Sequence, residues 1–529
     1  MSEHTHTVDN GDGTTSEVTL SGTGTKEQKV HNGAESPRMH GRRQIFTNET
    51  RIHSGNVLAV LNKALQVHQQ NRREEIYLER YMRGIQPIID RVKEYHTEIN
   101  NRIVVNIANQ IVTFKTSEFA GEPIQYVSRG NKPGVPEKVA KLNGMMIAEG
   151  KQSKDMQLAH RMYNMGVGYR LVIHDRDIGT GNGLFDEAPF EIYTPDPQNT
   201  FVVRSNDVSK RVVMGVTYVF LDDAESHVRY TVYTDNVTYT IDGSTMQADS
   251  IVGMQVHNFG MVTLIEYPCN ADYLGAFEVV LPLLDAYNLT MSNRLDGVEQ
   301  FIQAIMVFEG VDITREEFLR MKDLGALTVP PSPNGTTGKV YYLNEQLDQG
   351  QTQTLVNDMY QTILQIVGMP SQGNANTSDS SNNGAVIMKN GWWSAEARAL
   401  ETESQWKASE TEFLKVVLRI CEQTDTLTGL RISDLEPRFG RRSYEDLLTK
   451  TQSFSTLRSA GMPAIQAFTF SKLSKDPESD AIVYDTYQED LASGLDDEAG
   501  VARTGEQDTY WQTRRESDHE ELVAAGESE

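Results

Sequence analysis

The sequence predicts an α+β fold made of several parts, and three observations predict it. Long stretches before residue 120 and after residue 274 repeat apolar residues at three- and four-residue steps, which is the spacing of amphipathic helices. Between them, 168–268 consists of short β-rich runs separated by turn sequences such as GTGNG and PDPQN. Both chain ends are polar and aperiodic. The 529 residues suffice for several domains of about 100–200 residues each.

The first half is expected to begin with a disordered tail over 1–45, rich in Thr, Ser, Gly and Asn. A helical pattern then runs through 56–95. A second one covers 101–115, where Ile103, Ile107 and Ile111 recur at four-residue steps. The β-rich runs that follow predict an antiparallel region.

The second half is expected to contain long helices around a small α/β unit. Apolar residues from Phe277 to Ile305 predict one amphipathic helix, with Pro282 near its start or kinking it. In the unit over 303–345, ALTVP and KVYYL read as strands around the turn PSPNGTTG. The helical pattern resumes in QTQTLVNDMYQTILQIVG.

Thirteen mostly small, polar residues then precede the longest predicted helix, 384–423, which would span roughly 60 Å. Trp392 and Trp406 lie on its apolar face and are interpreted as packing anchors. Beyond the strand RISDLEPRFG, three shorter helices are predicted over 443–459, 463–474 and 477–492.

Charge and composition limit the possible partners. The formal net charge is −25, so a tight, non-specific grip on nucleic acid is not expected, because phosphate contacts need Lys and Arg. Cys269 and Cys421 are too few for a disulfide framework or a zinc site and suit a reducing compartment. No run approaches the roughly 18 apolar residues of a membrane helix, and the N-terminus lacks a secretory h-region. We expect synthesis in the cytoplasm and no membrane partner.

Motifs that would indicate an enzyme or a cofactor are incomplete. GTTGKV lacks the first glycine and the magnesium-binding hydroxyl of a P-loop, and GTGNGL lacks the last glycine of a dinucleotide fingerprint. His174, Asp175 and Asp177 could ligate a metal, but they are interpreted as ordinary hairpin-end polarity. H-E-x-x-H, G-x-S-x-G and a Cys/His nucleophile pattern are missing. The sequence therefore predicts no enzyme, no cofactor and no metal site.

Several segments, taken in order, resemble one known family. They are LERYMRGIQPI, NNRIVVNIANQIVTFKTSEFAGEPIQY, the stretch 257–301, IVGMPSQGNANTSDSSNNGAVIMKNGWW with the helix after it, ISDLEPRFG and AGMPAIQAF. Together they resemble the portal proteins of tailed bacteriophages, of the type found in long-tailed siphoviruses. Thr263 stands where that family often has Pro. The resemblance covers roughly 56–495.

The resemblance implies a ring of usually twelve subunits at one capsid vertex of the virion. Double-stranded DNA would pass through the ring during packaging and ejection, without sequence specificity. The implied partners are the packaging terminase, head-completion or adaptor proteins that connect head to tail, and the scaffolding and major capsid proteins. The implied division is a disordered tail (1–45), wing (46–273), stem helix (274–302), clip (303–345), second stem helix (346–369), tunnel loop (370–383), long wing helix (384–430), crown (431–495) and acidic tail (496–529).

The resemblance also implies roles for particular residues. The tunnel loop would project into the channel, and its residues fit this role because Gly, Asn and Ser tolerate many backbone conformations. Its DNA-facing candidates are Ser371, Gln372, Asn374, Asn376, Thr377, Ser378, Asp379, Ser380, Ser381, Asn382 and Asn383. Candidate acids facing the stem lumen are Asp296 and Glu299, although a solvated helix face fits both residues equally well. Candidate partner-facing residues of the clip are Arg315, Glu316, Arg320 and Asn334.

Two other interpretations stay open at this level. An enzyme of the packaging machinery, such as an ATP-driven motor or nuclease, would need a P-loop or an acidic metal cluster, and the sequence shows neither. A different structural minor capsid protein with long helices would share the helical pattern. Formation of a ring with a central hole distinguishes a portal from that alternative.

Overall fold

The computed structural model describes the backbone over most of the chain between residues 41 and 492. The described ranges are 4–9, 15–20, 41–94, 97–129, 132–174, 188–222, 224, 227–244, 246–302, 305–309, 316, 339–343, 349–370, 392–440, 447–474 and 477–492. The chain divides into two compact units, and the second holds the residues from Arg442 onward. Within the described part of the chain, no helix combines the length and apolar character that crossing a bilayer requires.

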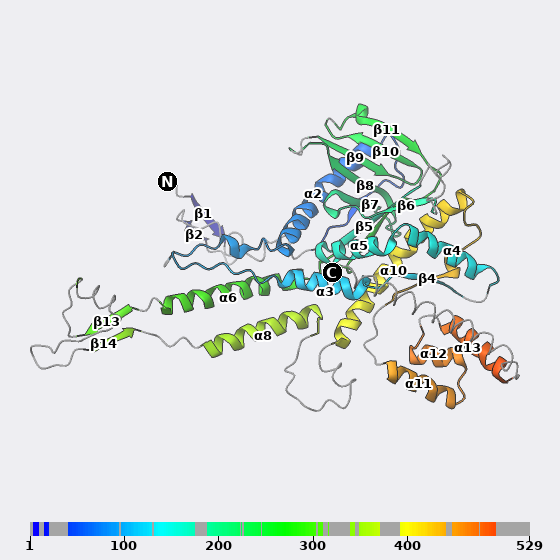
Figure 1. Ribbon diagram of the computed structural model, residues 1–529. Helices are drawn as coiled ribbons and strands as arrows, with labels where there is room; N and C mark the ends of the chain where they lie inside the picture. The colour runs from blue at the N-terminus through cyan, green and yellow to red at the C-terminus, as the bar shows by residue number, and fades with distance from the viewer. Residues whose placement is uncertain are drawn as a thin grey trace, which may run out of the picture. The chain divides into compact units, whose positions relative to one another are not determined.

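A six-stranded sheet in the first unit confirms the predicted antiparallel region. Its order is β11-β10-β9-β8-β7-β3, and every neighbouring pair is antiparallel except β3 with β7. Figure 1 labels β7 to β11 of this sheet. Helix α2 (Val57–Met82) packs on it through Val60, Leu61 and Ala64, which share a core with Val216 and Val232. The strands are β3 (Ile45–Thr47), β7 (Thr200–Ser205), β8 (Val212–Phe220), β9 (Val228–Tyr233), β10 (Val237–Asp242) and β11 (Ile251–Val256).

A second sheet of three strands lies at the centre of the largest core. Its order is β12-β5-β6, and helices α5 and α10 pack against it. Gly166 joins α5 to β5 at a φ of +85°, and an added Cβ there would lie 2.2 Å from the Tyr273 carbonyl oxygen. Only glycine fits this junction. The elements are α5 (Lys151–Met165), β5 (Val167–His174), β6 (Phe190–Tyr193), β12 (Leu264–Pro268) and α10 (Trp392–Gln423).

Charged side chains are buried where α10 crosses this sheet. Glu410 is fully buried, and its carboxylate accepts from Arg170 at 3.0 Å, Lys151 at 2.9 Å and the Tyr267 hydroxyl at 2.9 Å. Burial alone would raise the pKa of Glu410, but Lys151 and Arg170 lower it to about 2. Asp155 pairs with both cations, so the four charges balance in this buried cluster. Trp406 lies beside it with an exposed fraction of 1%.

Two predicted boundaries near the N-terminus are wrong. The helix expected over 101–115 begins only at Ile107, as α3 (Ile107–Ala120), because Asn106 caps it by accepting from the Asn109 N–H. Residues 4–9 and 15–20, expected to be disordered, form the antiparallel pair β1 (His4–Asp9) and β2 (Thr15–Leu20). Thr and Val, which favour strands, occur in both segments.

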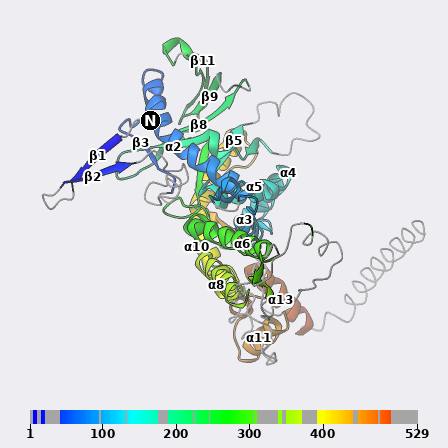
Figure 2. The same cartoon turned by 90° about the vertical axis from the view of Figure 1, so that its left-hand side faces the viewer.

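The long helices are confirmed where the structure describes them. The short η7 (Glu278–Val280) leads into α6 (Leu281–Ile302), with Pro282 in the first turn, where a missing N–H costs nothing. Helix α8 (Gln349–Val367) contacts α6, and the two lie side by side in both views (Figure 1, Figure 2). Between them β13 (Ile305–Glu309) pairs with β14 (Lys339–Leu343). The strand expected at ALTVP lies outside the described residues.

The second unit contains the three predicted short helices. They are α11 (Leu447–Ser459), α12 (Ala464–Ser471) and α13 (Pro477–Ala492), packed around Phe454, Phe468 and Tyr484. The preceding strand β15 (Leu435–Arg438) pairs instead with β4 (Gln125–Ser128) in the first unit. The strand β15 therefore belongs to the first unit, and the second unit holds the residues from Arg442 onward.

Candidate functional site

The face of α6 that is turned toward the body of the unit carries a row of polar side chains. Asn288, Ser292 and Asp296 follow one another at four-residue steps and are at most 2% exposed. They accept hydrogen bonds from the backbone N–H groups of residues 105, 103 and 101, at 2.9, 3.0 and 2.8 Å respectively. We call these three hydrogen bonds the α6 ladder.

The spacing of the ladder follows from the two backbone geometries. Four helical residues rise about 6.0 Å, and two extended residues span about 6.6 Å. In an extended segment alternate N–H groups point to the same side. A polar residue every fourth position of α6 therefore meets every second N–H of the segment before α3, which explains why 101–106 is not helical.

Asp296, the last residue of the α6 ladder, also forms ion pairs. Arg91 and Lys93 lie 3.1 and 3.0 Å from the Asp296 carboxylate, which also accepts from the Asn101 side chain. Burial alone would raise the pKa of Asp296, but the hydrogen bonds from Asn101 and Lys93 hold it below its ordinary value. Asp296 was expected to face a lumen, and its 2% exposure and its contacts within the chain argue against that position. Glu299, the other candidate, is half-buried.

The other end of α6 is fixed through side-chain amides. Gln86 accepts from Asn288 at 2.5 Å and donates to the Asn106 side chain at 3.2 Å. Asn106 in turn donates to the Met82 carbonyl at 2.8 Å, at the end of α2. Tyr81 donates to Asp285 on α6 at 2.8 Å. Helices α2, α3 and α6 are thus joined by one polar network.

The anchors of the predicted tunnel loop are well defined on both sides. The N–H of Gly368 donates to Gln365 and that of Met369 to Leu364, which is a Schellman ending for α8, with Gly368 at a φ of +70°. Past the loop, Trp392 opens α10 and packs against Phe114 of α3, with ring centroids 6.1 Å apart. The loop candidates from Ser371 to Asn383 lie outside the described residues.

Several apolar residues of α6 and α8 are exposed to solvent. On α6 these are Leu289, Leu295 and Val298, which are 37–44% exposed. On α8 they are Leu355 and Ile366, at 51% and 40%. Arg294 of α6 donates to Gln353 of α8 at 2.6 Å, so this contact between the helices is polar. Among the clip candidates, Glu316 is exposed, while Arg315, Arg320 and Asn334 lie outside the described residues.

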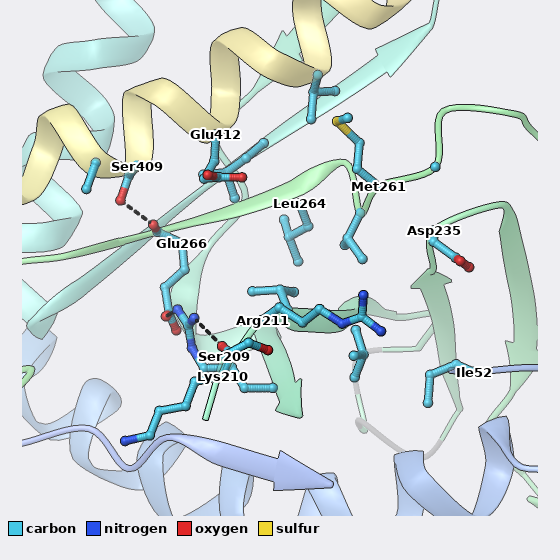
Figure 3. Close-up of a pocket in the computed structure, with 18 of the residues that line it drawn as sticks. Ile52, Ser209, Lys210, Arg211, Asp235, Met261, Leu264, Glu266, Ser409 and Glu412 are labelled. Atoms are coloured by element: carbon cyan, nitrogen blue, oxygen red, sulfur yellow. Dashed lines mark hydrogen bonds and ion pairs between the residues drawn. The ribbon is translucent and has the colours of Figure 1, made fainter. Parts of the chain in front are cut away.

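One pocket of about 960 Å³ lies between α10, the loop before β12 and the start of β8 (Figure 3). Its floor is apolar around Leu264 and Met261, and its rim carries Lys210, Arg211 and Glu412. Side chains in it pair with one another, as Arg204 does with Glu266. No group of three His, Cys, Asp or Glu side chains in the described ranges could hold a metal ion. The pocket shows no arrangement that indicates catalysis.

The ladder residues Asn288 and Ser292 were not predicted as part of a site. The signal was present, since polar residues interrupt the inner face of α6 at a constant spacing of four. Periodicity alone cannot show that their partner is an extended backbone.

We expect the change Asp296→Ala to loosen the segment before α3. Loss of a hydrogen-bonded charge should cost about 1.5–3 kcal/mol locally. Hydrogen exchange at residues 99–106 should therefore accelerate, as measured by mass spectrometry. Glu299→Gln, one turn further along α6, should leave this exchange unchanged. Equal exchange in both variants would contradict a supporting role for the ladder.

Comparisons with known proteins place the chain in a family. No curated protein sequence matches it. A solved structure described as the neck of an empty GTA particle computed with C6 symmetry is 11% identical, covering 70% of this chain and 91% of that chain, with a TM-score of 0.40. The family described as phage portal protein, SPP1 Gp6-like, matches residues 61–468, well over half of the chain. The chain therefore belongs to this family of phage portal proteins.

Proposed function

We propose that the chain assembles into a ring of about twelve subunits at one capsid vertex. Its central channel would pass double-stranded viral DNA during packaging and ejection. The observation that carries the proposal is the family match over 61–468, which includes α6, α8 and both anchors of the loop. The family is structural, and the described residues offer no catalytic arrangement that would favour an enzyme.

The exposed apolar residues of the long helices support assembly. Leu289, Leu295 and Val298 on α6, and Leu355 on α8, are not covered by the described part of the chain. Large exposed apolar patches on soluble proteins mark contact surfaces. Copies in a ring meet through two different surfaces, and exposed apolar side chains on two different helices are available for them.

Native mass spectrometry with negative-stain images of the same sample tests assembly. We expect one species of about twelve or thirteen subunits with a central hole. A protein that stays monomeric at high concentration would contradict self-assembly. A closed assembly without a hole would favour a different structural capsid protein.

We propose that residues 371–383 form a tunnel loop that contacts DNA by sterics and hydrogen bonds. Asp379 is the only charged residue between 371 and 388, so the loop offers no cation to hold phosphate. The formal charge of −25 per chain would also disfavour adhesion of DNA to the ring. Both properties suit a polymer that must slide.

Deletion of 372–382 should leave assembly intact and impair DNA packaging or retention. The anchors at Gly368 and Trp392 do not depend on the deleted residues, because their contacts are with α8 and α3. Ring formation by electron microscopy and DNA content per particle are the two measurements. Loss of the ring itself would contradict a loop role that is confined to DNA.

We propose that the segment between β13 and β14 forms the docking surface for the terminase and later for head-completion or adaptor proteins. The antiparallel pairing of β13 with β14 joins the ends of α6 and α8. Arg315, Glu316, Arg320 and Asn334 all lie in this segment. A ring at a capsid vertex would also contact the scaffolding and major capsid proteins.

A further inference from the structure

The residues that precede α2 hold the root of α6. We call residues 41–47 the strap. Gly41 has a φ of +67°, and an added Cβ would lie 1.9 Å from the Asp272 carbonyl oxygen. The Arg42 N–H donates to the Tyr273 carbonyl at 3.1 Å, and Ile45–Thr47 then joins the large sheet as β3. The strap therefore links the sheet to the chain just before η7.

One buried guanidinium joins four elements at this point. Arg42 is 4% exposed and lies 2.9 Å from Glu278 of η7 and 3.3 Å from Glu74 of α2. It also donates to the carbonyl of Met165, the last residue of α5. Because η7 runs directly into α6, the position of α6 depends on this set of contacts.

Buried carboxyl groups outnumber the buried cations here. Glu74, Glu75 and Glu278 are each at most 2% exposed. Arg42 is the buried cation, and Arg43, whose side chain is 34% exposed, pairs with Glu74 at 2.6 Å. Glu75 Oε2 is buried and has no hydrogen-bond partner among the described residues. An ionised carboxylate in such a place is costly, so it tends to take up a proton.

The electrostatic surroundings agree with this geometry. Burial raises the pKa of Glu278 to about 7, although Arg42 and the Gly275 N–H oppose the rise. Burial raises the pKa of Glu75 well above its ordinary value, again against Arg42. Within the described part of the chain, the ionisable groups that act on these two carboxyls are Arg42, Arg72, Glu74, Tyr169, Asp196 and Cys269. Arg43 pairs with the neighbouring Glu74.

We propose that Arg42, Glu74, Glu75 and Glu278 form a proton-operated latch between the strap and the root of α6. We call residues 275–285 the root of α6, and in the closed latch they are held against the strap. A proton on the buried carboxyl groups stabilises this closed state, and loss of the proton weakens it. The inference concerns the folded subunit, so it goes beyond the proposed channel and does not depend on ring formation.

The direction of the effect follows from linkage. A carboxyl group whose pKa is raised in the closed state prefers protonation there. Its contribution is fully present below the ordinary value near 4.5 and is lost as pH rises through about 7. Between pH 6 and 8 one such group changes the equilibrium of closed and open latch about tenfold.

Hydrogen exchange of the full chain tests the latch. After correction for the intrinsic pH dependence of exchange, protection of residues 41–47 and 275–285 should fall about tenfold from pH 6 to pH 8. Strands β9 and β10, which do not pair with β3, serve as the internal reference. Glu278→Gln should weaken the dependence at both segments, because it removes one of the two titrating carboxyl groups and leaves Glu75.

A second variant covers the case in which Glu278→Gln does not fold. Glu75 Oε2 has no hydrogen bond to lose, so Glu75→Gln should fold and should raise protection at pH 8 toward that at pH 6. Glu412→Gln changes an exposed carboxylate on α10 and should keep the wild-type profile. Constant or increasing protection of wild-type protein from pH 6 to 8 would overturn the latch. So would a Glu75→Gln profile identical to wild type.

Discussion

Replacement of Glu410 by glutamine is expected to lower the free energy of unfolding of the first unit by about 3–5 kcal/mol. Glu410 is fully buried and compensates Arg170 and Lys151, which are themselves 0% and 3% exposed. Without the carboxylate, two buried cations share only Asp155. Urea-induced unfolding followed by tryptophan fluorescence measures the change, since Trp406 lies within 5.8 Å of the Arg170 guanidinium.

Glu412→Gln is the matched control on the same helix. The Glu412 side chain is 62% exposed and pairs with Lys415 at the surface, so its loss should produce no measurable change. Equal midpoints for the two variants would contradict the importance of the buried cluster.

The same cluster predicts sensitivity to acid. The pKa of Glu410 is lowered to about 2 in the folded chain, below its ordinary value near 4.5. Its contribution to stability is therefore present above about pH 4.5 and is lost as pH falls toward 2. In Glu410→Gln this part of the acid dependence should be missing from the unfolding curves.

Replacement of Trp406 by alanine should cost about 3–5 kcal/mol. Its ring is 1% exposed and packs against Tyr267 and Phe119, with centroids 4.7 and 5.1 Å away. Trp392 was also expected to be an anchor, but it is half-buried, so Trp392→Ala should cost clearly less. Thermal unfolding of both variants measures the difference. A larger loss for Trp392→Ala would reverse the assignment.

The fold could be predicted where one face of an element is apolar. Helix α6 was found because apolar residues such as Leu281, Leu284 and Met291 recur at helical steps, and Pro282 fits its first turn. The strands β7–β10 were predicted because short β-rich runs there are separated by turn sequences. In both cases one face of the element is buried, so apolar residues recur in the sequence with the period of that helix or strand.

The residues of the site were harder to predict because their partners are distant in sequence. Asp296 looked like a solvated acid, and only the fold brings Arg91, Lys93 and Asn101 to it. Residues 101–106 looked helical because Ile103 and Ile107 share a spacing, but hydrogen bonds from α6 side chains favour the extended form. The pairing of β15 with β4 could not be predicted either, because the two strands lie far apart in the sequence.

The α6 ladder restricts how α6 can move against the body of its unit. The N–H groups of residues 101, 103 and 105 reach their acceptors together. A slide of a few ångströms breaks all three hydrogen bonds before any can form again, since equivalent N–H groups recur only about every 6.6 Å. Small displacements therefore meet a steep restoring force, and a larger displacement must be a discrete jump. Helix α6 therefore has discrete allowed positions along its axis. A force along that axis is transmitted to the body of the unit and does not make the helix slide gradually.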